Sequence, residues 1–225
     1  MTVTGLVSEA YDMSALRIAG PSWASEDSFE IVATLAPGTT KEQYRAMLRD
    51  LLTERFRLEI HREPRVVSLF ALTVGKGGSK LKTPQPDPPA DAAADAKQRQ
   101  SMKKDADGYP VFAPGISIMM TLANNGKPRA GPQAHNEAVE WLVKMLSGQL
   151  QTTVVDETGL TGKYDFAMNW VPEDRRAVTT PETADPAGPS LNSAVEEQLG
   201  LRLTRRKGPL EFIVIDRAER KPAEN

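Results

Sequence analysis

Acidic and hydroxyl side chains gather around one short loop of this 225-residue chain. Asp156 is followed by Thr158, Gly159 and Gly162, and Asp165 comes shortly afterwards. Carboxylates and threonines in such a cluster can hold a hard cation or act as acid and base. The same residues suit a tight turn, because glycines adopt unusual backbone angles and Asp and Thr bond local N–H groups. We favour the turn, since the spacing differs from that of the calcium-binding loop.

The histidines give little support for catalysis or metal binding. His61 lies on the polar side of an expected strand, and His135 lies in a loop rich in glycine and proline. A general base needs an orienting carboxylate and a nucleophile near it, and the chain has no Gly-x-Ser-x-Gly elbow. With two histidines and no cysteine, a His-rich site, a thiolate metal site and a cysteine nucleophile are excluded. We therefore expect no metal and no cofactor.

A basic cluster near the C-terminus offers a second kind of site. Arg202, Arg205 and Arg206 surround an expected turn, but no aromatic residues alternate with them to stack on bases. The formal net charge of −2 also excludes a strong basic field, so no nucleic-acid partner is expected. Charges that protect a strand edge are the simpler interpretation. Trp23, beside Gly20-Pro21, is the remaining candidate for a binding residue.

Hydrophobic periodicity predicts helices that each lead into strands. One helix begins with a capping box formed by Thr39 and Glu42 and continues to Phe56. Asn136 is expected to cap a second helix and Ser190 a third. A more degraded unit is expected in residues 1–35. The predicted strands lie at residues 16–18, 29–35, 57–61, 67–74, 116–122, 152–155, 164–170, 201–203 and 212–215.

The helical units share a spacing of apolar residues. Counted from Leu48, Leu142 and Leu191, these residues recur at offsets of 3, 4, 8, 10 and 12, with one polar exception in the second unit. Any amphipathic helix that enters a strand resembles this template, but three occurrences favour an internal repeat. The first unit has no strand before its helix, which leaves a sheet edge unpaired. We infer that an N-terminal segment is missing or that another strand covers this edge.

The predicted fold is α+β, with two similar αββαββ halves and helices packed on one face of antiparallel or mixed sheets. The first half covers residues 1–81 and the second residues 115–220. Proline, alanine and aspartate mark residues 82–114 as a flexible linker, and residues 172–189 as a loop within the second half. Residues 221–225 form a tail. No apolar run approaches a membrane span, and residues 1–20 lack the layout of a signal peptide.

Five ordered motifs resemble those of a large family of paralogous proteins of unknown function, typical of soil acidobacteria. They are Gly20-Pro21-Ser22-Trp23, the run from Met47 to Leu58 with His61-Arg62-Glu63, Lys76-Gly77-Gly78-Ser79-Lys80-Leu81, the run from Val155 to Phe166, and Gly188-Pro189-Ser190-Leu191 with Gln198-Leu199-Gly200-Leu201. The resemblance implies an extracytoplasmic protein, periplasmic or secreted, and carries over no catalytic residue. The second half also resembles the short periplasmic domains of secretins and TonB-dependent receptors, although a shared fold does not fix function.

We therefore expect an extracytoplasmic binding or assembly module that recognises a protein or a cell-envelope polymer, without catalysis. The alternative is a hydrolase of unknown substrate that uses carboxylates near Asp156 and Asp165, together with His61. The sequence leaves the ligand and the oligomeric state open.

Overall fold

The computed structural model describes residues 1–84, 117–124, 127–172 and 188–223. These residues form both helices and sheets, so the predicted α+β class is confirmed. Most of the predicted linker 82–114 and of the loop 172–189 lies outside the described residues. In chain order the elements are α1 (Val3–Tyr11), η1 (Ala15–Arg17), β1 (Ile18–Ala19), α2 (Trp23–Glu26), α3 (Lys41–Phe56), β2 (Glu59–Val74), β3 (Ile118–Asn124), β4 (Lys127–Ala138), α4 (Val139–Leu150), β5 (Val154–Asp156), β6 (Lys163–Ala167), α6 (Leu191–Leu199) and β7 (Leu201–Arg217).

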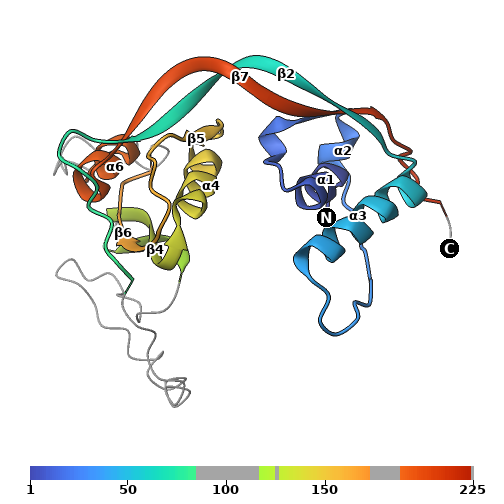
Figure 1. Ribbon diagram of the computed structural model, residues 1–225, viewed down its shortest axis with the longest axis horizontal. Coiled ribbons are helices and arrows are strands. Elements are labelled where there is room, and N and C mark those ends of the chain that lie inside the picture. The colour runs from blue at the N-terminus through green and yellow to red at the C-terminus, as the bar shows by residue number, and fades with distance from the viewer. Residues whose placement is uncertain (85–116, 125–126, 173–187, 224–225) are drawn as a thin grey trace. The chain divides into compact units, whose positions relative to one another are not determined.

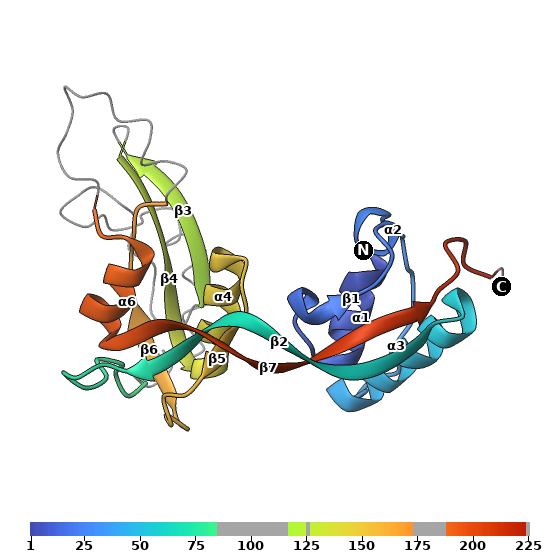
Figure 2. The same cartoon turned by 90° about the horizontal axis from the view of Figure 1, so that it is seen from above.

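The strands of the described residues form two sheets (Figures 1 and 2). The first sheet has the order β1-β7-β2-β5, with β1 parallel to β7 and β5 parallel to β2. Its central strands β2 and β7 run in opposite directions, because Glu59 at the start of β2 lies beside Arg217 at the end of β7. The second sheet, β3-β4-β6, is antiparallel.

The chain divides into two compact units, each assembled from segments that are far apart in the sequence. Unit 1 comprises Met1–Leu69, Ser147–Thr153 and Arg206–Asn225, and unit 2 comprises Phe70–Leu146 and Val154–Arg205. The long strands β2 and β7 therefore contribute residues to both units. Because these segments interleave, the predicted layout of two consecutive αββαββ halves is not confirmed.

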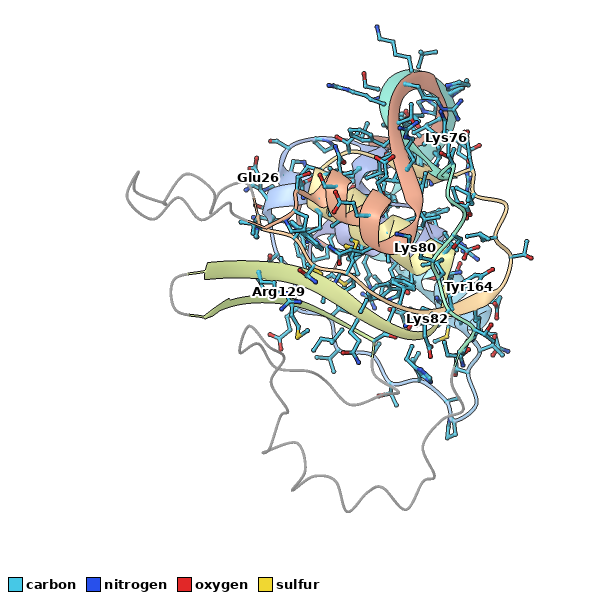
Figure 3. The ribbon with its side chains drawn as sticks, turned by 90° about the vertical axis from the view of Figure 1, so that its left-hand side faces the viewer. Glu26, Lys76, Lys80, Lys82, Arg129 and Tyr164 are labelled. Atoms are coloured by element: carbon cyan, nitrogen blue, oxygen red, sulfur yellow. The ribbon has the colours of Figure 1, made fainter. Side chains whose placement is uncertain are left out.

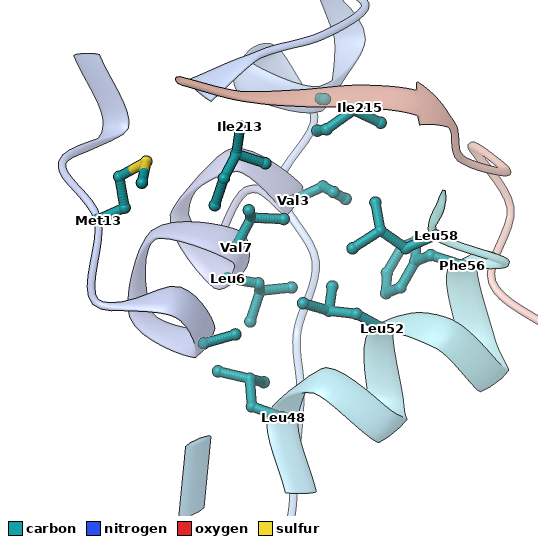
Figure 4. Close-up of a cluster of buried hydrophobic side chains, with 12 residues drawn as sticks. Val3, Leu6, Val7, Met13, Leu48, Leu52, Phe56, Leu58, Ile213 and Ile215 are labelled. Atoms are coloured by element: carbon teal, nitrogen blue, oxygen red, sulfur yellow. The ribbon is translucent and has the colours of Figure 1, made fainter. Parts of the chain in front are cut away.

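The core of unit 1 forms where α1 and α3 pack against β7 (Figure 4). Val7 from α1, Leu52 from α3 and Ile213 from β7 are completely buried, and Phe56 is only 2% exposed. Each of these side chains contributes roughly 1.5–3 kcal/mol by leaving water. Phe29 closes one side of this core with its ring edge-on to Phe56, 5.0 Å between centroids.

Helix α3 begins one residue later than the sequence predicts. Thr40, not Thr39, is the N-cap, and its hydroxyl oxygen accepts a hydrogen bond from the backbone N–H of Gln43 at 3.2 Å. The Gln43 side chain in turn accepts from the Thr40 N–H at 2.9 Å, which completes a capping box. Thr39 donates its hydroxyl to the Ala36 carbonyl instead. The sequence is compatible with a capping box of Thr39 and Glu42 or of Thr40 and Gln43. Because the Thr39 hydroxyl is bonded to Ala36 in the preceding turn, the box of Thr40 and Gln43 forms.

The four main helices end in the same way, at a residue with left-handed backbone angles. These residues are Asp12, Arg57, Gln151 and Gly200, with φ values of 49°, 48°, 48° and 67°. The last three stand nine residues after Leu48, Leu142 and Leu191, so the common spacing marks a shared helix ending followed by a strand. The strands that follow differ, because β2 and β7 are long whereas β5 has three residues. The structure therefore does not support a repeat of the whole unit.

Several strand predictions are corrected. Residues 29–35 were expected to form a strand, but they form neither helix nor strand, since Ser28 makes a single bridge to Thr2 and the pairing stops there. The two strands predicted at 57–61 and 67–74 are one strand, β2, which contains Pro64. Within the described residues, β7 alone pairs with that part of β2, and proline is tolerated in such an edge, where alternate residues point their N–H away from the ladder.

The C-terminal half of the chain brings two further corrections. The strands predicted at 201–203 and 212–215 are joined in β7, which continues through the expected turn at Lys207-Gly208-Pro209. Asn136 was expected to cap α4, yet it lies in a β-bulge of β4 with a φ of 54°. Helix α4 begins at Val139 instead. The strand predicted at 116–122 is present as β3, two residues later.

Candidate functional site

Among the residues that the structure describes, helices cover one face of the sheet of unit 1 and leave the other face open. Ile60, Ile213 and Ile215 belong to the core with α1 and α3, and Figure 1 shows these helices on the same side of the β2–β7 ribbon. Successive side chains of a strand point to opposite faces, so the alternate residues lie on the other side. We call this second surface the open face; it is formed by His61, Glu63 and Arg65 of β2 and by Phe212, Val214 and Asp216 of β7.

The polar residues of the open face form a continuous row. Asp216 Oδ1 lies 2.8 Å from His61 Nδ1, and the other ring nitrogen of His61 lies 3.6 Å from Glu63. The Arg65 Nε donates to Glu63 at 2.5 Å, and the Arg65 guanidinium lies over the ring of Phe212, 5.1 Å from its centroid. The row thus alternates between acidic and basic side chains, and it ends at Arg65, which covers the ring of Phe212.

This row shifts the protonation of its members. The hydrogen bond with Asp216 raises the pKa of His61 above its ordinary value, with further support from Glu63. The hydrogen bond from Arg65 lowers the pKa of Glu63. Both ring nitrogens of His61 face carboxylates, and this arrangement favours the protonated ring.

Asp156 stabilises its own loop. Its Oδ1 accepts hydrogen bonds from the backbone N–H of Thr158 at 2.8 Å and from the Thr158 hydroxyl at 2.7 Å. The Thr158 hydroxyl oxygen accepts from the N–H of Leu160 at 3.1 Å, and Gly159 has a φ of 69°. These contacts are those of a tight turn after β5, as the sequence predicts.

Asp165 holds the bulge of β4 against β6. Its Oδ1 accepts from the backbone N–H of Asn136 at 2.9 Å and lies 2.9 Å from Nδ1 of His135, whose side chain is 9% exposed. The backbone of Asp165 also forms two hydrogen bonds with Lys82, which Figure 3 labels beside Tyr164. Sequence reasoning placed His135 in a loop and did not connect it with Asp165, because their contact depends on the bulge.

The residues proposed for a hydrolase lie in different surroundings. His61 is part of unit 1, whereas Asp156 and Asp165 belong to unit 2. The contacts given above engage each of the three with its own neighbours. Within the described residues, no group of three or more His, Asp or Glu side chains could hold a metal ion.

The candidate binding residues also occupy separate places. Trp23 begins α2 and packs, partly buried, against the core of unit 1. Arg202, Arg205 and Arg206 are exposed along β7, and Arg202 lies 3.3 Å from Glu196 of α6. They form one stretch of a strand and do not surround the turn that was expected.

Sequence reasoning missed Arg65, Phe212 and Asp216. The signal that could have found them is the alternation at 61, 63 and 65 and at 212, 214 and 216, which places each set on one face of a strand. The pairing of β2 with β7 joins residues about 150 positions apart, and one sequence does not reveal that register.

Comparison with known proteins identifies the family. Residues 4–218 match the family model described as "Protein of unknown function (DUF3738)". The chain belongs to this family. No curated protein and no solved structure matches it. No helix within the described residues is long and apolar enough to cross a membrane. The family description assigns no activity, and the proposed likeness to secretin and TonB-receptor domains stays a prediction.

Proposed function

We propose that this DUF3738 protein is an extracytoplasmic binding or assembly module that recognises a protein partner through the open face. The observation that supports it is a sheet surface on which the half-buried Phe212 and Val214 lie beside the ion row of His61, Glu63 and Arg65. An apolar centre with a charged border is the usual anatomy of a protein-binding surface.

A protein partner fits this surface better than a carbohydrate polymer. Sugar rings bind to exposed aromatic faces, but the ring of Phe212 is covered by the Arg65 guanidinium. Arg65 is 39% exposed and its guanidinium is already oriented by Glu63, so a partner carboxylate can approach an ordered donor. Arginine and aromatic residues of this kind carry much of the energy in protein interfaces.

The extracytoplasmic location rests on the resemblance of the sequence motifs to a usually secreted family. Fractionation of the cells that produce the protein, followed by immunoblotting of each fraction, tests this part directly. Detection only in the cytoplasmic fraction would refute it.

The matched pair Arg65→Ala and Arg62→Ala tests the binding surface. Both arginines are on β2 and pair with a glutamate, and their side chains are 39% and 48% exposed, but only Arg65 is on the open face. Cross-linking in the producing cell and mass spectrometry would identify the bound protein, which is then titrated against the purified full chain. We expect Arg65→Ala to weaken binding by roughly tenfold or more, and Arg62→Ala by less than about twofold.

Three results would overturn the proposal. Equal effects of the two variants on affinity would place the interface elsewhere. Turnover of generic ester, phosphate or glycoside substrates that disappears in a folded Asp156→Ala variant would favour the hydrolase. Sedimentation of the chain with isolated peptidoglycan, unaffected by Arg65→Ala, would favour a polymer ligand at another site.

A further inference from the structure

Residues 31–36, which we call the docking segment, combine the composition of a β-strand with an unpaired backbone. The segment is Ile-Val-Ala-Thr-Leu-Ala, without charge, proline or glycine. Such short, uncharged, β-prone windows pair readily with other strands. Yet the structure forms no strand here, and no described residue gives residues 31–35 a backbone hydrogen bond.

The docking segment lies between α2 and α3, and both of its ends are fixed. At one end Phe29 exchanges backbone hydrogen bonds with Met1 and contacts Phe56. At the other end the Ala36 carbonyl accepts from the N–H and the hydroxyl of Thr39. A segment whose two ends are already fixed loses less conformational freedom when it pairs.

Ile31 packs, partly buried, against the core of unit 1, and residues 32–36 are exposed. Val32 is 90% exposed and Leu35 is 42% exposed. Beside them, a shallow groove of about 520 Å³ separates the turn at Ala36 and Pro37 from α3, where Met47 is 47% exposed. An exposed, β-prone segment whose backbone is unpaired can accept another strand, and the neighbouring groove, lined by Met47 and Ala46 as well as by polar residues, leaves room beside it.

We propose that the docking segment pairs antiparallel with the same segment of a second copy of this chain. In a register centred on Ala33, Ile31 lies opposite Leu35 and Val32 opposite Thr34. Glu30 then lies opposite Ala36, so no like charges face each other. This self-complementarity is what a two-fold symmetric interface requires, and cross-strand pairs of aliphatic and β-branched residues stabilise a sheet. The surface is distinct from the open face and does not depend on it.

A charge exchange across the pair tests the register. In the variant Val32→Lys with Thr34→Lys, lysines face each other twice across the interface. In the matched variant Val32→Lys with Thr34→Glu, each lysine faces a glutamate, while the loss of apolar surface is similar. Circular dichroism should show native helix content in both, because these side chains are exposed.

Sedimentation velocity of the full chain from micromolar to millimolar concentration measures association. We expect a reversible dimer for the wild type, a monomer for the lysine pair, and dimerisation restored by about tenfold or more in the lysine–glutamate variant. The amides of residues 31–35 should exchange more slowly as concentration rises. A wild type that stays monomeric throughout, or two variants that dimerise equally, would overturn the proposal.

Discussion

Nδ1 of His61 lies 2.8 Å from Oδ1 of Asp216, across the two central strands of the first sheet. Because this hydrogen bond raises the pKa of His61, the protonated ring stabilises the folded chain. The contribution is complete below the ordinary value of 6.5 and is lost as pH rises through the folded pKa. Exposure of the ring keeps the effect small.

Histidine titration followed by NMR should therefore place the pKa of His61 above 6.5. Asp216→Asn should shift this pKa back toward the ordinary value. In urea unfolding, the wild type should lose stability relative to His61→Gln as pH rises through the folded pKa. A His61 pKa at or below 6.5 would contradict the geometry of the row.

Substitution by alanine at two glycines should change the free energy of unfolding in opposite directions. Gly200 has a φ of 67°, and a Cβ there would lie 2.1 Å from the carbonyl oxygen of Gly78. Gly200→Ala should destabilise the chain by about 2 kcal/mol or more, since backbone must move and the angle is strained. Gly148 lies within α4 with open space around its Cβ position, so Gly148→Ala should stabilise by about 0.5–1 kcal/mol. Thermal unfolding of the two variants compares them, and the same direction in both would contradict this account.

Asp165→Ala should loosen the β4 bulge, because the His135 ring, which is 9% exposed, and the Asn136 N–H lose an acceptor. We expect a loss of about 1–3 kcal/mol in the free energy of unfolding. Asp165→Asn should cost less, since its amide oxygen can still accept from Asn136. Urea unfolding followed by circular dichroism measures both, and an alanine variant as stable as the wild type would show that the contact is unimportant.

The start of α3 offers a test of neighbouring threonines. Thr40→Ala removes a capping-box acceptor and should cost about 1 kcal/mol. Thr39→Ala removes only the bond to Ala36 and should cost less. Chemical denaturation separates the two, and a larger loss at Thr39 would favour the helix start that the sequence alone suggests.

Local structure was predictable where a helix buries one stripe of side chains. The apolar residues of α1, α3, α4 and α6 appear in the sequence at helical spacing, and all four helices are found. Three of the four residues with left-handed backbone angles that end these helices are Asp12, Arg57 and Gln151. Unlike glycine, these residue types do not predict a left-handed angle. In the sequence, the helix ends are therefore indicated only where the spacing of apolar residues changes from the helical period to the strand period.

Strand pairing was not predictable, because it depends on partners far away in the chain. The continuity of β2 through Pro64 and of β7 through Pro209 requires each strand to have the other beside it. The same pairing brings Arg65 onto Phe212 and His61 onto Asp216. A bulge that turns Asn136 and His135 toward Asp165 is likewise a tertiary effect. The sequence therefore predicted individual candidate residues, but not the residues that they contact in the fold.

The interleaving of the two units has a consequence for synthesis on the ribosome. Ile213 and Ile215 complete the core of unit 1, and Leu201 is fully buried in unit 2. Neither unit can therefore complete its folding before the ribosome has synthesised β7. Until then the nascent chain exposes the apolar stripes of its earlier helices, a state that invites chaperone binding. Splitting the gene between residues 84 and 117 should accordingly yield two fragments that fold only when they are produced together.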